Sequence, residues 1–359
     1  MYFTIVTPSF KQLDYLACCI ASVADQGTGS GRRRTEDGGQ EGSVTVRMSE
    51  CANARKWEST EVRKSDGAEE RISVEHIVQD AGSPGIEEFA EKTAERLLGQ
   101  YGGERVTNLQ TFELLHIRTS VGYTLRIFKE PDSGMYDAVN RGLKKGTGKI
   151  CAYLNCDEQY FQGSLRRIAQ IFADHQNWDL VFGGLAIVDP VGRLISIRRA
   201  CRLSLPHVMT CHLPNFTAGM FFRRTFLSKS QAWFDSSLRD VADAVWVITR
   251  LKEEIAIGCV PDITSAFTDT GANMNLSPNA RREVRILRQA APRWMKFLKP
   301  WWTLRHRLNK FLDGAYWPRP FQYQMYMRGP IPKRTAFSKQ RANPIWWSRL
   351  CLKDPNPSA

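Results

Sequence analysis

The stretch EPDSGMYDAVNRGLKKGTGKICAYLNCDEQY, residues 130–160, decides the fold. Asp132 or Ser133 can cap a helix near its start. Residues at helical spacing then supply a buried face for that helix: Met135, Ala138, Val139, Gly142 and Leu143. Residues 150–154 form a short apolar run, typical of a buried strand, which ends directly in the acidic turn NCDE at 155–158. The stretch therefore predicts a helix, a buried strand and an acidic turn in succession.

Two apolar runs nearer the amino terminus end in similar turns. Residues 3–6 stop at Thr-Pro-Ser, and residues 74–78 are soon followed by Asp-Ala-Gly-Ser-Pro-Gly. Strands that alternate with helices predict an α/β/α sandwich with a mainly parallel central sheet. In such folds ligands gather at the carboxyl ends of the strands. The acidic turns at Asp80, Asp132 and Asp157 would share that edge.

The domain organisation follows from changes in composition. Residues 1–290 carry the α/β pattern, and within them residues 179–188 and 194–197 flank a Pro-Val-Gly turn, which predicts a β-hairpin. Residues 27–71 contain few large apolar side chains and are predicted to be a mobile surface insertion. Residues 291–359 are predicted to be a basic, Trp-rich extension.

Length, composition and charge limit the class of protein. The chain has 359 residues, 42% of them hydrophobic, and a formal net charge of +13, which would attract phosphate groups. Its nine cysteines show no C-x-x-C spacing, so reduced thiols in the core are expected. The sequence lacks a spanning apolar run and a secretory signal, which favours the cytoplasm. No helix-turn-helix, zinc or RNA-stacking signature accompanies the charge, so nucleic acid is not expected as a partner.

Asp157 and Glu158 are neighbours at the end of the predicted strand 150–154. An abrupt turn there could aim both carboxylates into a ligand crevice, where hard oxygen ligands suit Mg²⁺ or Mn²⁺. Such a cation would absorb the charge that develops on a diphosphate leaving group. Plain turn carboxylates are the alternative.

Four segments together carry a family resemblance: TIVTPSF (4–10), EHIVQDAGSPG (75–85), the stretch 130–160 and FDSSLRDVADAVWVITRL (234–251). In this order they resemble the family 2 inverting glycosyltransferases of the branch that builds bacterial surface polysaccharides. The resemblance implies a GT-A fold, a metal-dependent transferase, and a UDP-, dTDP- or GDP-linked sugar as donor. It also implies a glycan or lipid-linked acceptor.

The resemblance implies roles for individual residues on the donor side. Thr7, Pro8 and Asp80 should border the nucleotide base and ribose. Four further residues should lie nearest the donor: Asp132, Asp137, Asn140 and Arg141. A solvated helix charge is the alternative for Arg141, and stabilisation of the helix dipole is the alternative for Asp137.

Cys156-Asp157-Glu158 matches the family's Ser-Asp-Asp metal motif, with Cys for Ser and Glu for the second Asp. The resemblance makes Asp157 a donor ligand, and Asp157 and Glu158 the metal ligands. Ser83-Pro84-Gly85 also departs from the family, since it lacks a second acidic residue. These departures motivate an alternative function: a catalytically impaired protein that still binds nucleotide sugars.

Asp243 lies where the family places its catalytic aspartate, the general base that accepts a proton from the attacking acceptor hydroxyl. Asp240, three residues earlier, is the alternative base. Farther on, residues 269–273 resemble a glycine-rich segment of the family, which could close over product or be a plain turn.

Trp alternates with Arg and Lys in residues 294–350. Indole rings and cations suit a membrane surface, so peripheral contact with the inner face of the membrane is one prediction. A C-terminal helix packed on the catalytic domain is the alternative.

Overall fold

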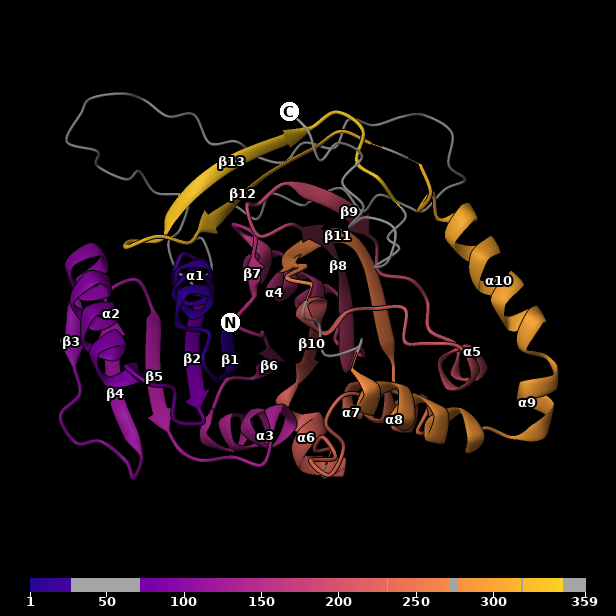
Figure 1. Ribbon diagram of the computed structural model, residues 1–359, viewed down its shortest axis with the longest axis horizontal. Helices are drawn as coiled ribbons and strands as arrows, with labels where there is room; N and C mark the ends of the chain where they lie inside the picture. Colours follow the sequence, from indigo (N-terminus) through magenta and orange to yellow (C-terminus); the bar gives the residue numbers. More distant parts are fainter. Residues whose placement is uncertain (27–71, 231, 272–276, 318, 345–359) are drawn as a thin grey trace.

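The computed structural model describes residues 1–26, 72–230, 232–271, 277–317 and 319–344. The insertion predicted at 27–71 lies outside these residues. The structure is a mixed α/β sandwich around one large twisted sheet, with a second, two-stranded sheet across one side (Figure 1). The predicted fold class is confirmed.

Four neighbouring strands in the order β5-β2-β1-β6 form a parallel centre. They are β1 (Tyr2–Ser9), β2 (Ser73–Asp80), β5 (Tyr123–Lys129) and β6 (Ile150–Tyr153). Each coincides with an apolar run of the sequence, because strands buried on both faces need apolar side chains on both. The short strands β3 (Gly103–Arg105) and β4 (Glu113–Thr119) extend this side of the sheet.

The other half of the sheet is mixed. Its strands are β10 (Met220–Arg223), β8 (Leu180–Val188), β11 (Ile257–Thr268), β7 (Glu158–Tyr160) and β9 (Leu194–Arg198). β10 lies antiparallel between β6 and β8, and β11 runs parallel to β8. β8 and β9 form the predicted hairpin. Over the whole sheet β3, β5, β2, β1, β6, β8 and β11 share one direction, so the sheet is mainly parallel.

Side-chain alternation along β1 divides the interior into two cores. Phe3 and Ile5 pack in one core with residues of α1, α2 and α4, whereas Val6 packs in another with residues of α3 and α7. The sandwich is therefore covered on both faces. The helices concerned are α1 (Leu13–Ala24), α2 (Ile86–Tyr101), α3 (Met135–Lys145), α4 (Ser164–Asp174) and α7 (Ala242–Lys252).

The remaining helices include α9 and α10, which form the outer edge on one side of the molecule (Figure 1). They are α5 (Leu205–Thr210), the 3-10 turn η1 (Thr217–Gly219), α6 (Arg224–Ser230), α8 (Pro278–Gln289), α9 (Arg293–Phe297) and α10 (Lys299–Leu312). Ala291 and Met295 pack with residues of α5 and α7. The C-terminal segment thus contacts the α/β domain directly.

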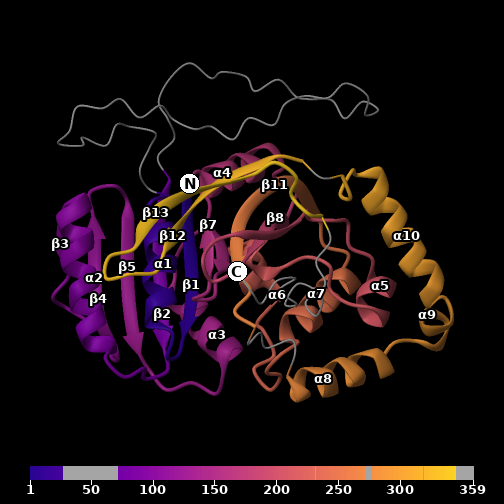
Figure 2. The same cartoon turned by 45° about the horizontal axis from the view of Figure 1, so that its top comes forward.

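The hairpin β12 (Phe321–Met327) and β13 (Lys333–Lys339) crosses over α1 and β7 (Figure 2). Tyr323 and Met325 pack against Val188 and Ala266 of the main sheet. This part of the predicted extension is therefore a strand pair on the α/β domain, which the sequence pattern did not indicate. The boundary at residue 290 stays a prediction.

Within the described residues no helix is long and apolar enough to cross a membrane. The seven cysteines of this part of the chain are free thiols, and five are buried, as expected for core residues: Cys18, Cys19, Cys151, Cys156 and Cys201.

Candidate functional site

The register of the parallel strands brings their polar ends to one level. Ser9 of β1 pairs with Asp80 of β2, and Asp80 pairs with Lys129 of β5. The turn after β6 reaches the same edge, because the Cys156 thiol donates a hydrogen bond to the Pro8 carbonyl at 3.3 Å. The turns of β1, β2, β5 and β6 therefore share the carboxyl edge, where α/β folds bind ligands.

Acidic side chains converge at this edge. Burial and the negative charge of Asp157 raise the pKa of Glu158, and the charge of Asp243 adds to that shift. Burial raises the pKa of Asp157 itself. The charges of Asp157, Asp80 and Glu158 also act on the Cys156 thiol, whose pKa burial raises to about 12. Carboxylates far apart in the chain are therefore close enough to repel one another.

Asp243 occupies the first turn of α7. Its Oδ1 accepts a hydrogen bond from the Ala244 amide at 2.7 Å. Burial raises its pKa, while Ala244 and the Tyr136 hydroxyl, its hydrogen-bond partner from α3, oppose that shift. A carboxylate of raised pKa with a polar partner has the properties of a general base.

Asp240 does not share this setting. Its Oδ2 accepts hydrogen bonds from Ser277 Oγ at 3.1 Å and from Asn279 Nδ2 at 2.6 Å. Glu283 of α8 in turn accepts the backbone amides of Arg239, Asp240 and Val241. Asp240 is thus part of a network that fastens the segment before α7 to the start of α8.

Asp80 is completely buried at the end of β2. Its Oδ1 accepts the amides of Gly82 at 2.9 Å and Ser83 at 2.6 Å, and its Oδ2 accepts Ser83 Oγ at 2.7 Å. A carboxylate has about four acceptor positions, so most of those of Asp80 are used within this turn. The main role of the Asp80 carboxylate in this structure is therefore to order the turn at residues 80–83.

Thr7 points its side chain into the sheet interior. Its hydroxyl lies 2.9 Å from His76 Nε2, and His76 Nδ1 lies 2.9 Å from the Tyr123 hydroxyl. Burial lowers the pKa of His76 to about 3. The hydrogen-bonded side chains of Thr7, His76 and Tyr123 lie beneath the carboxyl edge. Because the Thr7 hydroxyl is used in this series, Thr7 can contact a ligand at the edge through its backbone and not through its hydroxyl.

The buried side chain of Asn140 on α3 both donates a hydrogen bond to the backbone of Phe234 and accepts one from it. Its Nδ2 donates to the Phe234 carbonyl at 2.8 Å, and its Oδ1 accepts the Phe234 amide at 3.0 Å. The side chain thereby holds the segment that leads to Asp243 against α3. Sequence reasoning placed Asn140 at the donor and missed this contact, because it joins residues 94 positions apart.

Asp137 and Arg141 belong to an ion-pair network at the start of α3. Asp137 accepts the Ser133 amide at 3.0 Å and Arg141 Nε at 3.1 Å. Arg141 Nη1 also reaches Glu130 at 2.5 Å, and Lys145 Nζ reaches Glu130 at 2.7 Å. Arg141 is therefore an ion-paired side chain and not simply a solvated charge.

Asp132, half-buried just before α3, caps the local turn by accepting the Gly134 amide at 2.9 Å. Burial raises its pKa, as do the charges of Asp137 and Asp80, although Gly134 and Arg141 oppose the shift. Asp132 thus faces the same electrostatic region as Asp80.

The segment predicted at 269–273 follows β11. Thr268 donates its amide to the Asp157 carbonyl at 3.0 Å, which ties the end of β11 to the acidic turn. Asp269 Oδ1 accepts the Gly271 amide at 3.1 Å, and Gly271 has a φ of 76° that favours glycine. This part is a turn beside Asp157; residues 272 and 273 lie outside the described residues.

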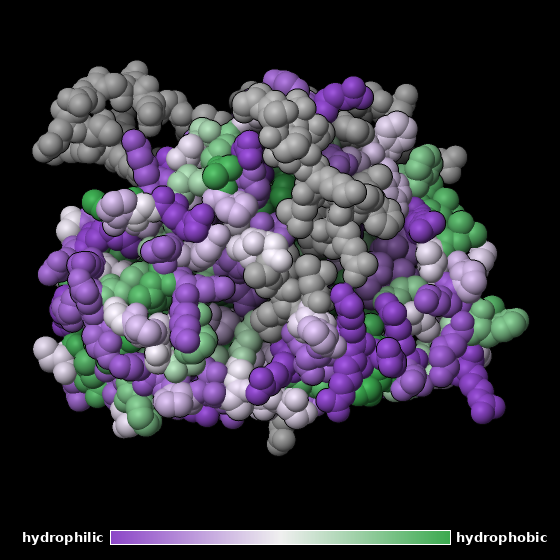
Figure 3. Space-filling model, viewed as in Figure 1, coloured by the Kyte–Doolittle hydropathy of each residue, from purple (hydrophilic) through white to green (hydrophobic). Residues whose placement is uncertain are grey.

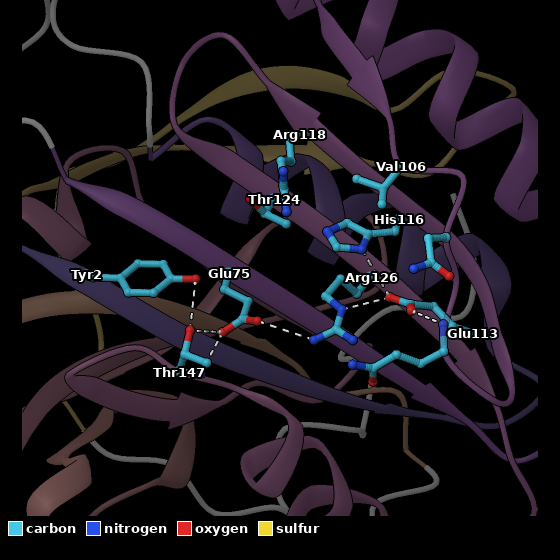
Figure 4. Close-up of a pocket in the computed structure, with 11 residues that line it drawn as sticks. Tyr2, Glu75, Val106, Glu113, His116, Arg118, Thr124, Arg126 and Thr147 are labelled. Carbon is cyan, nitrogen blue, oxygen red and sulfur yellow. Dashed lines mark hydrogen bonds and ion pairs between the residues drawn. The ribbon is translucent and has the colours of Figure 1, made fainter.

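A separate hollow of about 410 Å³ opens at the opposite, amino ends of the strands (Figure 4). Its polar lining is already paired: Arg126 bonds Glu113 at 2.7 Å and lies 3.5 Å from Glu75, which also accepts the Thr147 amide at 2.8 Å. The hollow lacks the convergent carboxylates of the carboxyl edge. We therefore take the acidic edge as the candidate site.

Comparisons with known proteins give a partial likeness. No protein-family model matches the chain. A 76-residue segment is 33% identical to PGL/p-HBAD biosynthesis glycosyltransferases of Mycobacterium bovis and Mycobacterium tuberculosis. The match covers 21% of this chain and 30% of those relatives. The chain is thus similar to curated glycosyltransferases over one segment.

Two solved structures are similar to this chain at low sequence identity. TarS 1–349 of S. aureus in complex with UDP is 14% identical, with a TM-score of 0.48, over 87% of this chain and 74% of that chain. The mannosyltransferase PcManGT of Pyrobaculum calidifontis in complex with GDP-Man and Mn2+ is 12% identical. Its TM-score is 0.42, over 87% of this chain and 63% of that chain.

Proposed function

We propose that this protein is an inverting glycosyltransferase of the GT-A type, which moves a sugar from a nucleotide-diphosphate donor to an acceptor hydroxyl. The observation that carries the proposal is that the Cys156-Asp157-Glu158 turn lies at the same carboxyl edge as Asp80, with Asp243 near enough for its charge to act on Glu158. The segment shared with mycobacterial glycosyltransferases supports the same class of reaction. A role in cell-surface polysaccharide synthesis is part of the proposal.

A divalent cation fits this site. The negative charges of Asp157 and Asp243 repel that of Glu158. A divalent cation bound by carboxylate oxygens would reduce this repulsion between buried like charges. Asp157, which is half-buried, would hold Mg²⁺ or Mn²⁺, with Glu158 beside it. The cation would supply charge stabilisation for the departing diphosphate.

The donor is proposed to be a UDP-, dTDP- or GDP-linked sugar whose nucleotide lies along the ends of β1 and β2. Pro8 and the backbone of Thr7 would border the base, and the turn that the buried Asp80 carboxylate orders would border the base or ribose beside them. Asp132 would approach the donor directly. The bonded side chains of α3, namely Asp137, Asn140 and Arg141, would shape the site by fixing its walls.

Asp243 is proposed to act as the general base. Its carboxylate would accept the proton of the acceptor hydroxyl while the acceptor oxygen bonds to the anomeric carbon. The bond from that carbon to the diphosphate oxygen breaks in the same displacement, and the nucleoside diphosphate leaves. Attack from the face opposite the leaving group inverts the configuration. Tyr136, through its hydrogen bond, would orient the Asp243 carboxylate.

A lipid-linked acceptor, with the protein at the inner face of the membrane, is proposed from the exposed surface of α9 and α10. Phe297 is 84% exposed, Leu304 58% and Leu308 52%. With Trp301 and Phe311 these side chains recur every three or four residues, which makes a continuous apolar stripe. Hydrophobic and hydrophilic side chains lie together at this right-hand edge in Figure 3. Exposed Lys299, Arg305 and Arg307 would meet anionic headgroups.

A nucleotide-sugar-binding protein without turnover is the second candidate. It is favoured by Glu158, whose Oε2 accepts the Asn155 amide at 2.7 Å and which is buried, so its carboxylate is partly committed to the turn. An active enzyme would then depend on Asp157 alone for metal contact.

A screen of nucleotide sugars separates the two candidates. Free nucleotide released from UDP-, dTDP- and GDP-sugars would be measured with Mn²⁺, with Mg²⁺ and with chelator, and donor binding by calorimetry. The transferase predicts cation-dependent release from one donor class. Binding of a donor without any release, with acceptors supplied, would instead favour the binding protein.

A further inference from the structure

Three histidines away from the acidic edge meet between α5 and α10. His207 lies on α5, His212 two residues after that helix ends, and His306 on α10. One ring nitrogen from each lies within 4.8 Å of the other two. In the part of the chain that the structure describes, no other three His, Cys, Asp or Glu side chains lie close enough to share a metal ion in this way.

His207 is the least exposed member and has unused nitrogens. The residue is 2% exposed, and neither ring nitrogen has a hydrogen-bond partner among the described residues. The Trp302 backbone lies near enough to act on its pKa, but outside hydrogen-bond geometry. Buried polar atoms are normally bonded, so both nitrogens of His207 are available to a ligand. His212 is exposed and gives an ion access from solvent.

The protonation states suit metal binding. Burial lowers the pKa of His207. Burial, together with the neighbouring His207 ring and the Lys310 ammonium group, lowers the pKa of His306 to about 3. Both rings are therefore neutral at pH 7, with lone pairs available. Neutral imidazole nitrogen is a preferred ligand of Zn²⁺ and a poor ligand of Mg²⁺.

We propose that His207, His212 and His306 bind one Zn²⁺ that fastens α10 to α5. Zn–N bonds of about 2.1 Å in a tetrahedral site place the nitrogens roughly 3.4 Å apart. The rings of His207 and His306 are stacked with centroids 4.1 Å apart, so inward rotation of the side chains would complete the site. Three protein ligands leave a fourth position open.

The charges around the cluster point to the fourth ligand. The positive charges of Lys310 and Arg198 help to lower the pKa of His306, and the charge of Arg288 helps to lower the pKa of His212. These cations oppose a bare dication but stabilise an anion bound to it, so hydroxide or chloride is expected at the open position. Burial and Arg198 lower the pKa of Lys310 to about 8, which makes its positive charge easier to remove than that of an ordinary lysine.

The proposed zinc accounts for the unusual orientation of α10. The helix turns His306 and Lys310 toward the protein and leaves Leu304 and Leu308 in solvent. Hydrophobic burial alone would favour the reverse orientation. A zinc ion bound by both His306 of α10 and His207 of α5 would hold the polar face of α10 against the protein and leave its apolar stripe in solvent.

The test uses the full chain stripped of metal with chelator and dialysed. Zinc content after reloading would be measured by elemental analysis, the melting temperature followed with and without Zn²⁺, and Co²⁺ used as a spectroscopic probe of nitrogen ligation. We expect one equivalent of zinc, a higher melting temperature with Zn²⁺ but not with Mg²⁺, and a tetrahedral Co²⁺ spectrum. The variant H306A should lose these responses, with an affinity for zinc at least about 100-fold weaker.

His175→Ala is the matched control, since His175 is exposed directly after α4, where it stacks on Trp178. It should bind zinc as the parent chain does. H212A tests the same site at an exposed position, where the fold is least disturbed. H212A should likewise lose zinc affinity. If the parent chain bound no zinc, or if H212A and H306A both bound zinc as tightly as the parent chain, the proposal would be overturned.

Discussion

Gln159 and Tyr326 hold each other through two hydrogen bonds across 167 positions of sequence. Gln159 Nε2 donates to the Tyr326 carbonyl, and its Oε1 accepts the Tyr326 amide, both at 2.8 Å. Tyr326 also donates its hydroxyl to Asp25 at 2.9 Å. Because Gln159 directly follows Glu158, the C-terminal hairpin is attached to the strand that begins at the proposed metal site.

The first prediction concerns this attachment. Gln159→Ala should lower the free energy of unfolding by about 2 kcal/mol, because two hydrogen bonds are lost and two backbone groups of Tyr326 lose their partner. Urea denaturation measures the change. Gln162→Ala, at an exposed position whose contact to Arg334 is 3.4 Å long, should change it by less than about 0.5 kcal/mol. Equal effects of the two variants would mean that the hairpin is not held at Gln159.

The second prediction concerns the wall of the site on α3. Asn140→Ala removes both hydrogen bonds to Phe234 and should cost about 2 kcal/mol of stability. It should also lower turnover, since the segment before Asp243 loses its anchor. Asn108→Ala, at an exposed position of the distant hollow, serves as control. Full stability in Asn140→Ala would show that this contact does not hold the segment.

The third prediction concerns pH. Burial raises the pKa of Asp157 and Glu158 above their ordinary values of 3.8 and 4.5. Above those values the folded, metal-free protein binds more protons than the unfolded chain, so the contribution of this pair to stability falls as pH rises. The slope is at most about 1.4 kcal/mol per pH unit for each proton. Mn²⁺ should reverse the trend by binding the ionised pair.

Urea denaturation at pH 5 to 8 in chelator measures this contribution. The double variant Asp157→Asn, Glu158→Gln should lose both the downward trend and the response to Mn²⁺. If parent and variant gave parallel pH profiles, the two carboxylates would not be the source of the dependence.

The fourth prediction concerns the apolar stripe of α10. Leu304→Gln with Leu308→Gln should reduce sedimentation with anionic phosphatidylglycerol vesicles at least about 10-fold, because two exposed apolar side chains lose their contact with lipid. Stability should be unchanged, since both residues are exposed. Val191→Gln, an equally exposed apolar position between β8 and β9, is the control. Undiminished vesicle binding by the double variant would exclude this surface.

Local pattern in the sequence was sufficient for the elements that position the site. The apolar runs at 3–6, 74–78 and 150–154 became β1, β2 and β6, because each strand is buried on both faces. The helical spacing from Met135 to Leu143 became α3. The acidic turns then fell at one edge as a consequence of parallel pairing.

Contacts between distant residues were beyond such reasoning. β10 enters between β6 and β8 although it comes after both in the chain. The C-terminal hairpin reads as a basic tail, since only Tyr323, Met325 and Tyr326 of β12 are buried. The meeting of His207 with His306 depends on how α10 returns to α5, which no local spacing encodes.

The measurement closest to the central claim compares Asp243→Asn with Asp240→Asn in a nucleotide-release assay with Mn²⁺, the accepted donor and an acceptor. Loss of the base should reduce turnover by a factor of about 10² to 10⁴ while donor affinity is retained. Asp240→Asn, whose carboxylate faces α8, should keep turnover within a few-fold of the parent chain. Undiminished turnover in Asp243→Asn, or selective loss in Asp240→Asn, would contradict the account.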